Sequence, residues 1–291
     1  MIHTIENEFL RVCVSEQGAE LQSILGSDGT EYLWQADPAY WGKKAPNIFP
    51  YVARLVQGSY YLDGQLYQMK IHGIAQYRSF SLKERSAQRL VLELCSDADT
   101  YAQYPRRFAF RVIYALEDNT LHVTYEAENL DSQPMYFGLG GHPGFRVPLV
   151  NGLDFTDYRL RFSSPCVPER VGFNADCFVT GQNTPYPLEG DTVLKLQHEL
   201  FDDDAIVLHN MAHTVTLETE KDCHGVTVTY PDMPYLGIWH MPKTDAPYVC
   251  IEPWSSLPAK EGSITVLEEQ QDLICLSGGK TYTNTWQIAI H

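Results

Sequence analysis

The chain has 291 residues and a formal net charge of −16, from 37 acidic and 21 basic side chains. This charge repels phosphate backbones and anionic lipids, so we expect no nucleic acid and no membrane surface among its partners. Hydrophobic residues make up 44% of the chain, which excludes a disordered protein and permits a large core. The N-terminus has no basic segment followed by an apolar run, and no run reaches 18 apolar residues, so we predict a cytoplasmic protein.

Short apolar or alternating segments dominate the sequence and predict strands. These segments are residues 10–14, 20–25, 89–95, 108–116, 120–128, 214–219, 226–230, 263–268 and 281–290. A turn-forming cluster at 117–119 joins two of them, so residues 108–128 predict a hairpin. Helical periodicity is limited to residues 97–104 and 194–200, where we expect short helices.

Long helices do not alternate with the strands, which disfavours a doubly wound parallel sheet. Residues 165–187 are rich in Pro, Gly, Asn and Asp and predict an excursion over the surface. No linker, repeat or change of composition divides the chain. We therefore predict an all-β fold, with residues 1–291 forming one large antiparallel β-sandwich domain.

The cysteines are widely spaced, odd in number and contain no Cys-x-x-Cys pair. They are Cys13, Cys95, Cys166, Cys177, Cys223, Cys250 and Cys275. Several lie within apolar runs, so we expect reduced and buried thiols. Cys223-His224 is the one close pair of zinc-type ligands, so we expect no structural zinc.

Two polar side chains interrupt apolar stretches in the first quarter of the chain. Arg54 follows the mostly apolar residues 46–53, and burying an unpaired guanidinium is costly. It therefore pairs with an internal carboxylate, lines a polar cavity or lies exposed on a strand. His72 precedes Gly73, which permits a turn or a close approach to a ligand. His72 is either a structural histidine or a hydrogen-bond donor into a cavity.

His142 lies in a glycine-rich segment, Gly-Leu-Gly-Gly-His-Pro-Gly, at residues 138–144. The glycines permit an irregular backbone, and Pro143 restricts the backbone immediately after the histidine. A histidine held in this way can be aimed at one point in a cavity. The segment is not a dinucleotide-binding fingerprint, because its spacing differs and no helical pattern comes after it.

Carboxylates accompany two further apolar runs. Glu252 follows the run at 248–251 and precedes Pro253 and Trp254. Because proline lacks an N–H, we expect the strand to end there. Glu252 then either faces water or is a base whose pKa is raised at the mouth of the strand. Of the acids at 202–204, Asp204 lies nearest the next strand and is the candidate to point inward, with Asp203 as the alternative.

The ordered set of these motifs resembles the aldose 1-epimerases, or galactose mutarotases, and is most similar to their LacX-like bacterial branch. The motifs are the Asn-Ile-Phe-Pro segment leading to Arg54, His72-Gly73, Gly-His-Pro around His142, and Cys-Ile-Glu-Pro-Trp at 250–254. They cover nearly the whole chain. The chain differs from the family in two places that concern the substrate. Gln76 follows Ala75 where the family often has Arg, and residues 51–53, just before Arg54, differ from the family's usual sequence.

The resemblance implies a galactose mutarotase-like β-supersandwich, no metal or cofactor, and interconversion of the α and β anomers of a small-molecule aldose. Glu252 matches the family's general base, which takes the proton of the C1 hydroxyl. His142 matches the general acid, which protonates the ring oxygen. Arg54 and His72 match positions that bind sugar hydroxyls, and Asp204 matches a substrate-binding aspartate.

Three other functions remain open on the sequence. A glycoside hydrolase needs two carboxylates, which Glu252 and Asp204 could supply. A sugar-binding protein without catalysis could use the same scaffold, because a fold does not fix a function. A hexose phosphate could be the substrate if Arg54, Arg78 or the Lys43-Lys44 pair forms an anion site. The sequence is compatible with a monomer or a homodimer.

Overall fold

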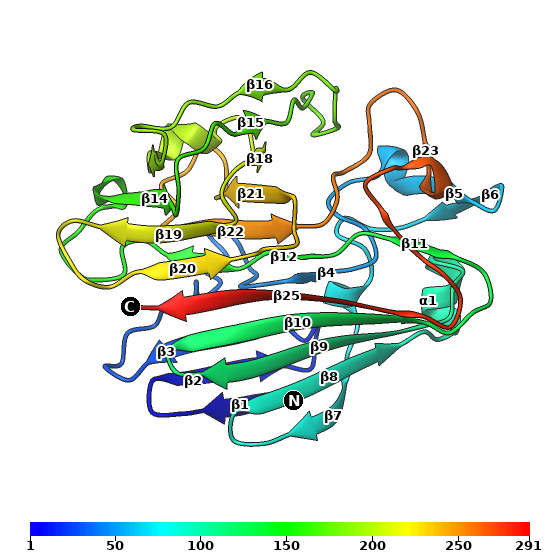
Figure 1. The fold of residues 1–291 in the computed structure, drawn as a ribbon, viewed down its shortest axis with the longest axis horizontal. Helices are drawn as coiled ribbons and strands as arrows, with labels where there is room; N and C mark the ends of the chain where they lie inside the picture. The colour runs from blue at the N-terminus through cyan, green and yellow to red at the C-terminus, as the bar shows by residue number, and fades with distance from the viewer.

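Two large sheets carry most of the chain in the computed structural model, which describes residues 1–291 (Figure 1). The nine-stranded sheet has the spatial order β17 (Val193–Lys195), β14 (Tyr158–Phe162), β19 (Thr214–Thr219), β20 (Val226–Thr229), β25 (Thr281–Ile290), β10 (Thr120–Asn129), β9 (Phe108–Glu117), β8 (Arg89–Cys95) and β7 (Ser81–Arg85). The eight-stranded sheet has the order β16 (Thr184–Pro185), β15 (Glu169–Arg170), β18 (Ile206–His209), β21 (Tyr235–Trp239), β22 (Tyr248–Trp254), β12 (Gly140–Gly141) and β4 (Asn47–Ile48), and β13 (Gly144–Arg146) also pairs with β22.

Smaller elements cover the edges of these sheets. Three small sheets are formed by β1 (Ile2–Glu6), β2 (Leu10–Ser15) and β3 (Leu21–Gly26), by β11 (Met135–Phe137) and β24 (Ile274–Leu276), and by β23 (Thr265–Val266), β5 (Ser59–Leu62) and β6 (Gln65–Gln68). The helices are α1 (Ala98–Gln103) and the single 3₁₀ turns η1 (Val56–Gly58), η2 (Ala75–Tyr77), η3 (Phe155–Asp157), η4 (His198–Phe201) and η5 (Leu267–Glu269). None of these helices has the length and apolarity needed to cross a membrane.

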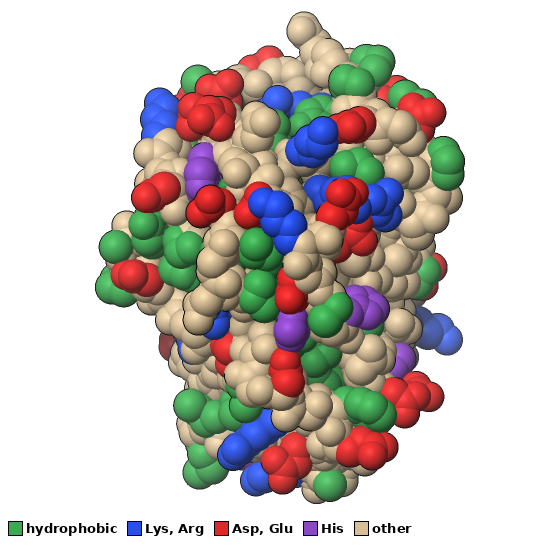
Figure 2. Space-filling model, turned by 90° about the vertical axis from the view of Figure 1, so that its left-hand side faces the viewer, with side chains coloured by type: hydrophobic (Ala, Val, Ile, Leu, Met, Phe, Trp, Pro, Cys, Tyr) green, Lys and Arg blue, Asp and Glu red, His purple; other side chains and the backbone are tan.

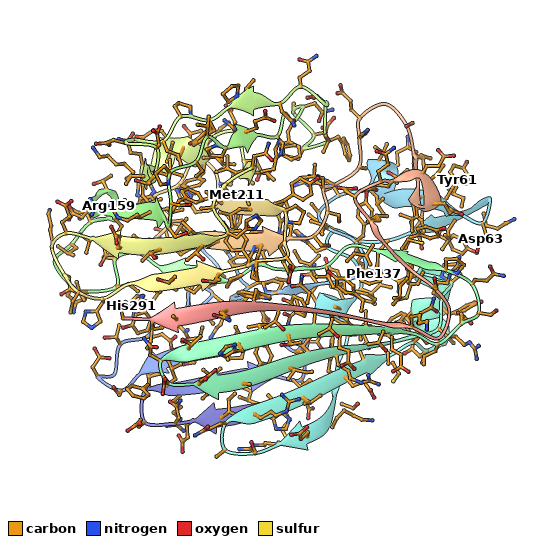
Figure 3. All side chains as sticks on the ribbon, in the orientation of Figure 1. Tyr61, Asp63, Phe137, Arg159, Met211 and His291 are labelled. Carbon is orange, nitrogen blue, oxygen red and sulfur yellow. The ribbon has the colours of Figure 1, made fainter.

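Alternating side chains build the core between the two large sheets. In β10 the residues Leu121, Val123, Tyr125 and Ala127 are buried, while their neighbours are half-exposed. The facing strands β21 and β22 contribute buried side chains such as Ile238 to the same cluster of 66 buried hydrophobic residues. The side chains drawn in Figure 3 fill the space between the sheets. Figure 2 shows the side of the molecule that lies on the left in Figure 1, where acidic, basic and hydrophobic side chains are interspersed.

Most of the predicted elements are confirmed, including the all-β fold and its antiparallel sandwich. The hairpin at 108–128 is β9 and β10, which pair in register from Thr120 and Glu117 to Asn129 and Phe108. The helix predicted at 97–104 is α1, whose N-cap is Asp97: its side chain accepts a hydrogen bond from the amide of Thr100. This capping explains why so short a helix forms at this place.

Four expectations are wrong in whole or in part. Residues 263–268 form only the two-residue β23 before η5, and the short helix expected at 194–200 is limited to the 3₁₀ turn η4, because 193–195 form β17. Residues 165–187 are more than a surface excursion, because β15 and β16 extend the eight-stranded sheet and Val171 and Val179 are buried. The seven cysteines are free as expected, but only Cys250 is buried. For Cys13, Cys95 and Cys275 strand alternation explains this, because it turns their side chains away from the core. The remaining three lie outside the strands.

Asn47 joins the two large sheets through a buried hydrogen-bond network. Its amide nitrogen donates to the carbonyl oxygens of Gly18 and Ala19 and to the hydroxyl of Tyr114, over 2.9–3.1 Å. Its amide oxygen accepts from the hydroxyl of Tyr125 at 2.8 Å. Asn47 lies on β4 in one sheet, and both tyrosines lie on the other sheet, so this side chain fixes how the sheets meet.

Replacing Asn47 by alanine is therefore expected to destabilise the protein by about 2–3 kcal/mol, because it leaves buried tyrosine and carbonyl groups without partners. Urea denaturation measures this change in the free energy of unfolding. Asn151→Ala, at an exposed position, is the control and should stay within about 0.5 kcal/mol of the wild type. Equal stability of the two variants would contradict the proposed role of the Asn47 network.

Candidate active site

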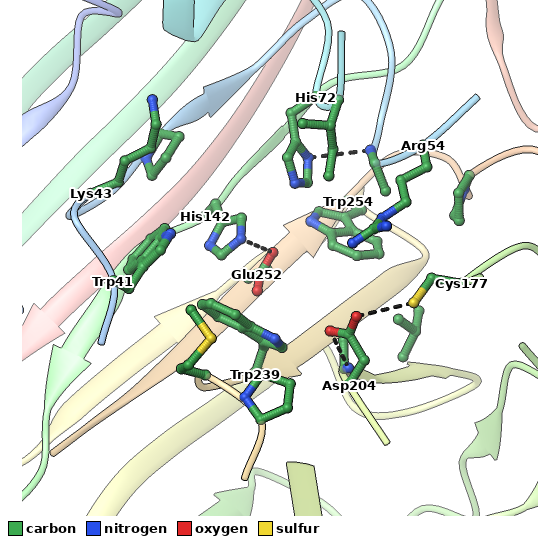
Figure 4. Close-up of a pocket in the computed structure, with 18 of the residues that line it drawn as sticks. Trp41, Lys43, Arg54, His72, His142, Cys177, Asp204, Trp239, Glu252 and Trp254 are labelled. Atoms are coloured by element: carbon green, nitrogen blue, oxygen red, sulfur yellow. Dashed lines mark hydrogen bonds and ion pairs between the residues drawn. The ribbon is translucent and has the colours of Figure 1, made fainter. Parts of the chain in front are cut away.

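A cavity of about 440 Å³ opens above the middle strands of the eight-stranded sheet, and all five predicted site residues line it (Figure 4). They are Arg54, His72, His142, Asp204 and Glu252. These residues come from segments far apart in the sequence, so the fold brings them together. The cavity has the size of a small-molecule site.

Glu252 reaches the cavity from the middle of β22, whose seven residues are all buried. Val249 and Ile251 point to the core between the sheets. The alternate residues Cys250, Glu252 and Trp254 therefore point to the opposite face, and Glu252 and Trp254 line the cavity there. Glu252 is only 1% exposed, so it is not a strand-end glutamate that faces water.

The expectation that Pro253 ends the strand is wrong. β22 continues to Trp254, and Pro253 is opposite Leu236 of β21. The amides of Ile251 and Ser255 donate to the carbonyl oxygens of Pro143 and Leu139, so the nitrogen of Pro253 faces the chain between those two residues. That chain bends away from β22 between β12 and β13. A backbone N–H at position 253 would therefore have no partner in the sheet, so proline is tolerated there.

His142 occupies this bend between β12 and β13. Its amide donates to the carbonyl of Pro46 at 3.0 Å, and β13 resumes pairing with β22 at Gly144. Gly141 is required just before it, because a Cβ there would lie 2.4 Å from the ring of Trp286. The glycine-rich segment thus allows His142 to leave the ladder and face Glu252.

His142 and Glu252 form a buried pair. Nε2 of His142 lies 3.2 Å from Oε2 of Glu252, within ion-pair distance but without hydrogen-bond alignment. Nδ1 of His142 and Nε1 of Trp254 are likewise buried without a partner in the protein. Buried polar atoms usually have partners, and cavity-lining atoms without one are suited to bind a ligand.

Burial shifts the protonation of both members of the pair. It raises the pKa of Glu252 well above its ordinary value, and the negative charge of Asp204 adds to this effect. Burial also lowers the pKa of His142 well below its ordinary value, helped by His72. Both charged forms are disfavoured, so a single proton shared by the pair favours Glu252 over His142.

Two tryptophans enclose His142. The ring of Trp41 stacks on the imidazole with centroids 4.9 Å apart, and Trp239 meets it edge-on at 5.7 Å. These apolar walls exclude water from the imidazole and limit its rotation. Stacking against an indole face also stabilises an imidazolium when one forms.

His72 is held in a single tautomer. The amide of Ala53 donates to Nδ1 of His72 at 3.2 Å, so Nδ1 is the acceptor and Nε2 carries the hydrogen. Burial, with the cations of Arg54 and Lys43, lowers the pKa of His72 to about 3. His72 is therefore a neutral hydrogen-bond donor at Nε2, the second of the two possibilities that its sequence context leaves open.

Arg54 and Asp204 lie on the opposite side of the cavity from Trp41 (Figure 4). Arg54 is exposed and lines the cavity, and no carboxylate lies within ion-pair distance, so of its three possibilities the internal ion pair is excluded. Asp204 accepts from the amide of Ala205 at 2.9 Å and from the thiol of Cys177 at 3.0 Å. Asp203 also lines the cavity but is exposed, so Asp204 is the better fixed of the two acids.

Of the basic residues considered for an anion site, Arg54 and Lys43 line the cavity, and Lys44 and Arg78 do not. Lys43 lines the cavity, while the ammonium of Lys44 donates to Gln22 and Gln35. Arg78 forms ion pairs with acids of the segment around α1 and does not line the cavity. The family often has an arginine at position 76. Here Gln76 lines the cavity at that position, and Arg78 does not replace the arginine there.

Sequence reasoning missed several cavity residues. Trp41 comes from a segment without regular structure, Trp239 from the end of β21, and Cys177 from residues assigned to the surface. The tryptophans had one available signal, since large aromatic residues often line sugar sites. Nothing in its local sequence marks Cys177.

Known proteins resemble this chain over nearly its whole length. A family model described as Aldose 1-epimerase matches residues 1–271. The chain is 30% identical over 300 residues to the chromosomal protein LacX of Lactococcus lactis subsp. lactis, with 98% of both chains covered.

Solved structures resemble the whole chain. A galactose mutarotase related enzyme from Lactobacillus acidophilus is 32% identical, with a TM-score of 0.95 over 100% of this chain and 97% of that one. A galactose mutarotase-like protein from Lactobacillus casei ATCC 334 is 31% identical, with a TM-score of 0.93 over the full length of both chains. The predicted galactose mutarotase-like fold is thereby confirmed.

The position of His72 depends on Gly73. Gly73 has a φ of 78°, and a Cβ there would lie 2.3 Å from the carbonyl oxygen of Phe49. We expect Gly73→Ala to destabilise the protein by about 3 kcal/mol, from left-handed backbone strain and from the clash. Gly64→Ala is the matched control, because Gly64 has a φ of 71° and open space around it, and should cost about 1 kcal/mol. Equal losses in urea denaturation would show that the clash is unimportant.

Proposed function

Because this chain belongs to the aldose 1-epimerase family, we propose that it is an isomerase that interconverts the α and β anomers of a free hexose. The observation that carries the proposal is the buried pair of Glu252 and His142, 3.2 Å apart at the base of a sugar-sized cavity. A carboxyl group and an imidazole that share one proton can remove a proton from one oxygen and deliver one to another.

In the proposed reaction, Glu252 takes the proton of the C1 hydroxyl and His142 gives a proton to the ring oxygen. The C1–O5 bond breaks, its electron pair goes to the ring oxygen, and C1 becomes an aldehyde carbon. Rotation about C1–C2 presents the other face of the aldehyde, and the reverse proton transfers close the ring. The pair holds one proton before and after each half-reaction, so the catalyst returns unchanged.

Burial of the pair supports these roles in a definite way. A carboxylate that is shielded from water is a stronger base, and a shielded imidazolium is a stronger acid. The reactive state needs the shared proton on His142 rather than on Glu252. Hydroxyl groups of a bound sugar would supply the hydrogen bonds that the ionised pair lacks, and the face of Trp41 would favour the imidazolium.

The remaining cavity residues are suited to hold a neutral polyol. Nε2–H of His72 and the guanidinium of Arg54 donate hydrogen bonds, and the carboxylate of Asp204 accepts them. The indole rings of Trp41 and Trp239 offer apolar surfaces for the C–H faces of a pyranose. These groups would orient the hexose so that C1 and the ring oxygen lie between Glu252 and His142.

A hexose 6-phosphate is the second substrate that a specific observation favours. Lys43 and Arg54 line the cavity without a carboxylate in ion-pair distance, although acids outnumber bases in the chain. Parallel assays with glucose, galactose and glucose 6-phosphate distinguish these substrates. A phosphate preference would appear as a lower KM for the phosphorylated sugar and would leave the acid–base assignment unchanged.

Glu252→Gln is expected to lower the rate of anomer exchange by about 10²–10⁴-fold, because an amide cannot act as the base. Polarimetry of freshly dissolved α-D-glucose and α-D-galactose measures this rate. Glu269→Gln, an exposed change outside the cavity, is the control and should retain wild-type activity.

Three results would contradict the proposed function or its assignment of the base. If the wild type does not accelerate exchange for any of the three sugars yet binds one of them, the protein is a non-catalytic sugar-binding module. If Glu252→Gln retains full activity, Glu252 is not the base. Release of reducing sugar from an aryl glycoside would instead indicate a glycoside hydrolase.

Asp204→Asn is expected to raise the KM about tenfold with a smaller change in kcat, because it weakens the acceptor for a sugar hydroxyl that is bound before and during reaction. Asp203→Asn is the matched comparison, since it is the neighbouring and more exposed acid of the same cavity. We expect it to change the KM less than twofold. The opposite ranking in steady-state polarimetry would assign the contact to Asp203.

A further inference from the structure

Cys250 lies directly beside the pair of Glu252 and His142. It is two residues before Glu252 on β22 and points to the same face of the strand. One ligand atom from each of these three side chains lies within 4.8 Å of the other two, and all three side chains are buried. Cys250 does not line the cavity and has no place in the proposed proton transfers.

We propose that Cys250, Glu252 and His142 form a binding site for a zinc ion, which occupies the base of the cavity in competition with the sugar. Thiolate, imidazole and carboxylate are the three ligand types that zinc prefers in proteins. One of the proposed ligand atoms, Oε2 of Glu252, is buried without a hydrogen-bond partner in the protein. The site would be inhibitory, because it engages the acid and the base together.

The spacing of the pair suits tetrahedral zinc. Zinc–nitrogen and zinc–oxygen bonds of about 2.0–2.1 Å place neighbouring tetrahedral ligands about 3.3 Å apart. Nε2 of His142 and Oε2 of Glu252 are 3.2 Å apart. A zinc–sulfur bond of about 2.3 Å allows the thiolate to stand slightly farther away. Three protein ligands leave the fourth position for a water molecule in the cavity.

Charge balance also favours the site. A Zn²⁺ ion bound by one thiolate, one carboxylate and one neutral imidazole forms a group without net charge. The buried region therefore avoids the main cost of placing an ion there.

The ligand set selects among metal ions. Calcium and magnesium prefer oxygen ligands and would gain little from sulfur and nitrogen. Cobalt(II) accepts the same tetrahedral ligands as zinc and absorbs light through its thiolate bond, so it reports whether a cysteine is bound. The competing interpretation is that Cys250 is only a small core residue packed with Trp34 and Tyr248.

Two other cysteines need controls. Cys177 lies 3.0 Å from Asp204 at the side of the same cavity. Cys223 stands with Asp222 and His224 in an exposed cluster of similar composition. The experiment therefore uses full-length protein carrying Cys223→Ala, alone and combined with Cys250→Ala or with Cys177→Ser.

Zinc binding is measured by titration calorimetry, and cobalt binding by the sulfur-to-cobalt absorption band. We expect one metal per chain in the Cys223→Ala protein, with the band present, and the same in the Cys177→Ser combination. Cys250→Ala should remove the band and weaken zinc at least about tenfold, since even an outer-shell change costs about 10–100-fold. Sugar at saturating concentration should weaken zinc binding in the Cys223→Ala protein.

The urea denaturation midpoint shows whether Cys250→Ala folds. If it does not, Glu252→Gln, which keeps the thiol, is the second test of the site. It should also weaken zinc at least about tenfold. The proposal is overturned if the band persists in Cys250→Ala, if Glu252→Gln binds zinc as tightly as its parent, or if the Cys223→Ala protein binds no thiolate-ligated metal. None of these readouts depends on epimerase activity, so they remain valid if the proposed function fails.

Discussion

The register of β22 is the constraint on which the rest of the site depends. β21 pairs with it on one side, and β12 and β13 pair with it on the other. A shift of one residue would turn Glu252 into the core and Ile251 into the cavity, because strand side chains alternate between faces. The break between β12 and β13 then places His142 opposite Glu252. The register of β22 and the break between β12 and β13 therefore determine the positions of both Glu252 and His142.

A rigid surround stabilises this arrangement. Two ionisable groups are held away from water without full hydrogen bonding, which costs stability. The compensation lies in the large apolar core and in fully bonded polar groups such as Asn47. Glu252 lies on the paired strand β22, and His142 lies in the two-residue bend between β12 and β13, which both pair with β22. Arg54, Asp204 and Cys177 instead come from loops that line the cavity. We interpret this as a fixed chemical centre with a more adaptable wall, a division that is common in enzymes.

Local sequence patterns are sufficient to predict much of the fold. The hairpin of β9 and β10 and the strands β8, β19 and β25 follow from alternation and turn residues, and α1 from its capping sequence. Arg54, His72, His142, Asp204 and Glu252 are identified from short motifs and a family resemblance, and the structure places all of them on one cavity. Trp41, Trp239 and Cys177 could not be placed, because their approach depends on tertiary contacts between distant segments. The continuation of β22 through Pro253 escapes prediction for the same reason: it depends on a bend in the neighbouring chain.

The position of β25 has a consequence for folding during synthesis on the ribosome. β25 lies between β10 and β20, so it is the strand that joins the two parts of the nine-stranded sheet. Both parts precede residues 281–290 in the sequence and emerge earlier during translation. Each then presents an unpaired strand edge until β25 is made, and such edges promote association with other chains. Nascent chains therefore need protection during this interval, by chaperones or by wide spacing of the ribosomes on the message. This need is greater for this topology than for a sheet assembled in sequence order.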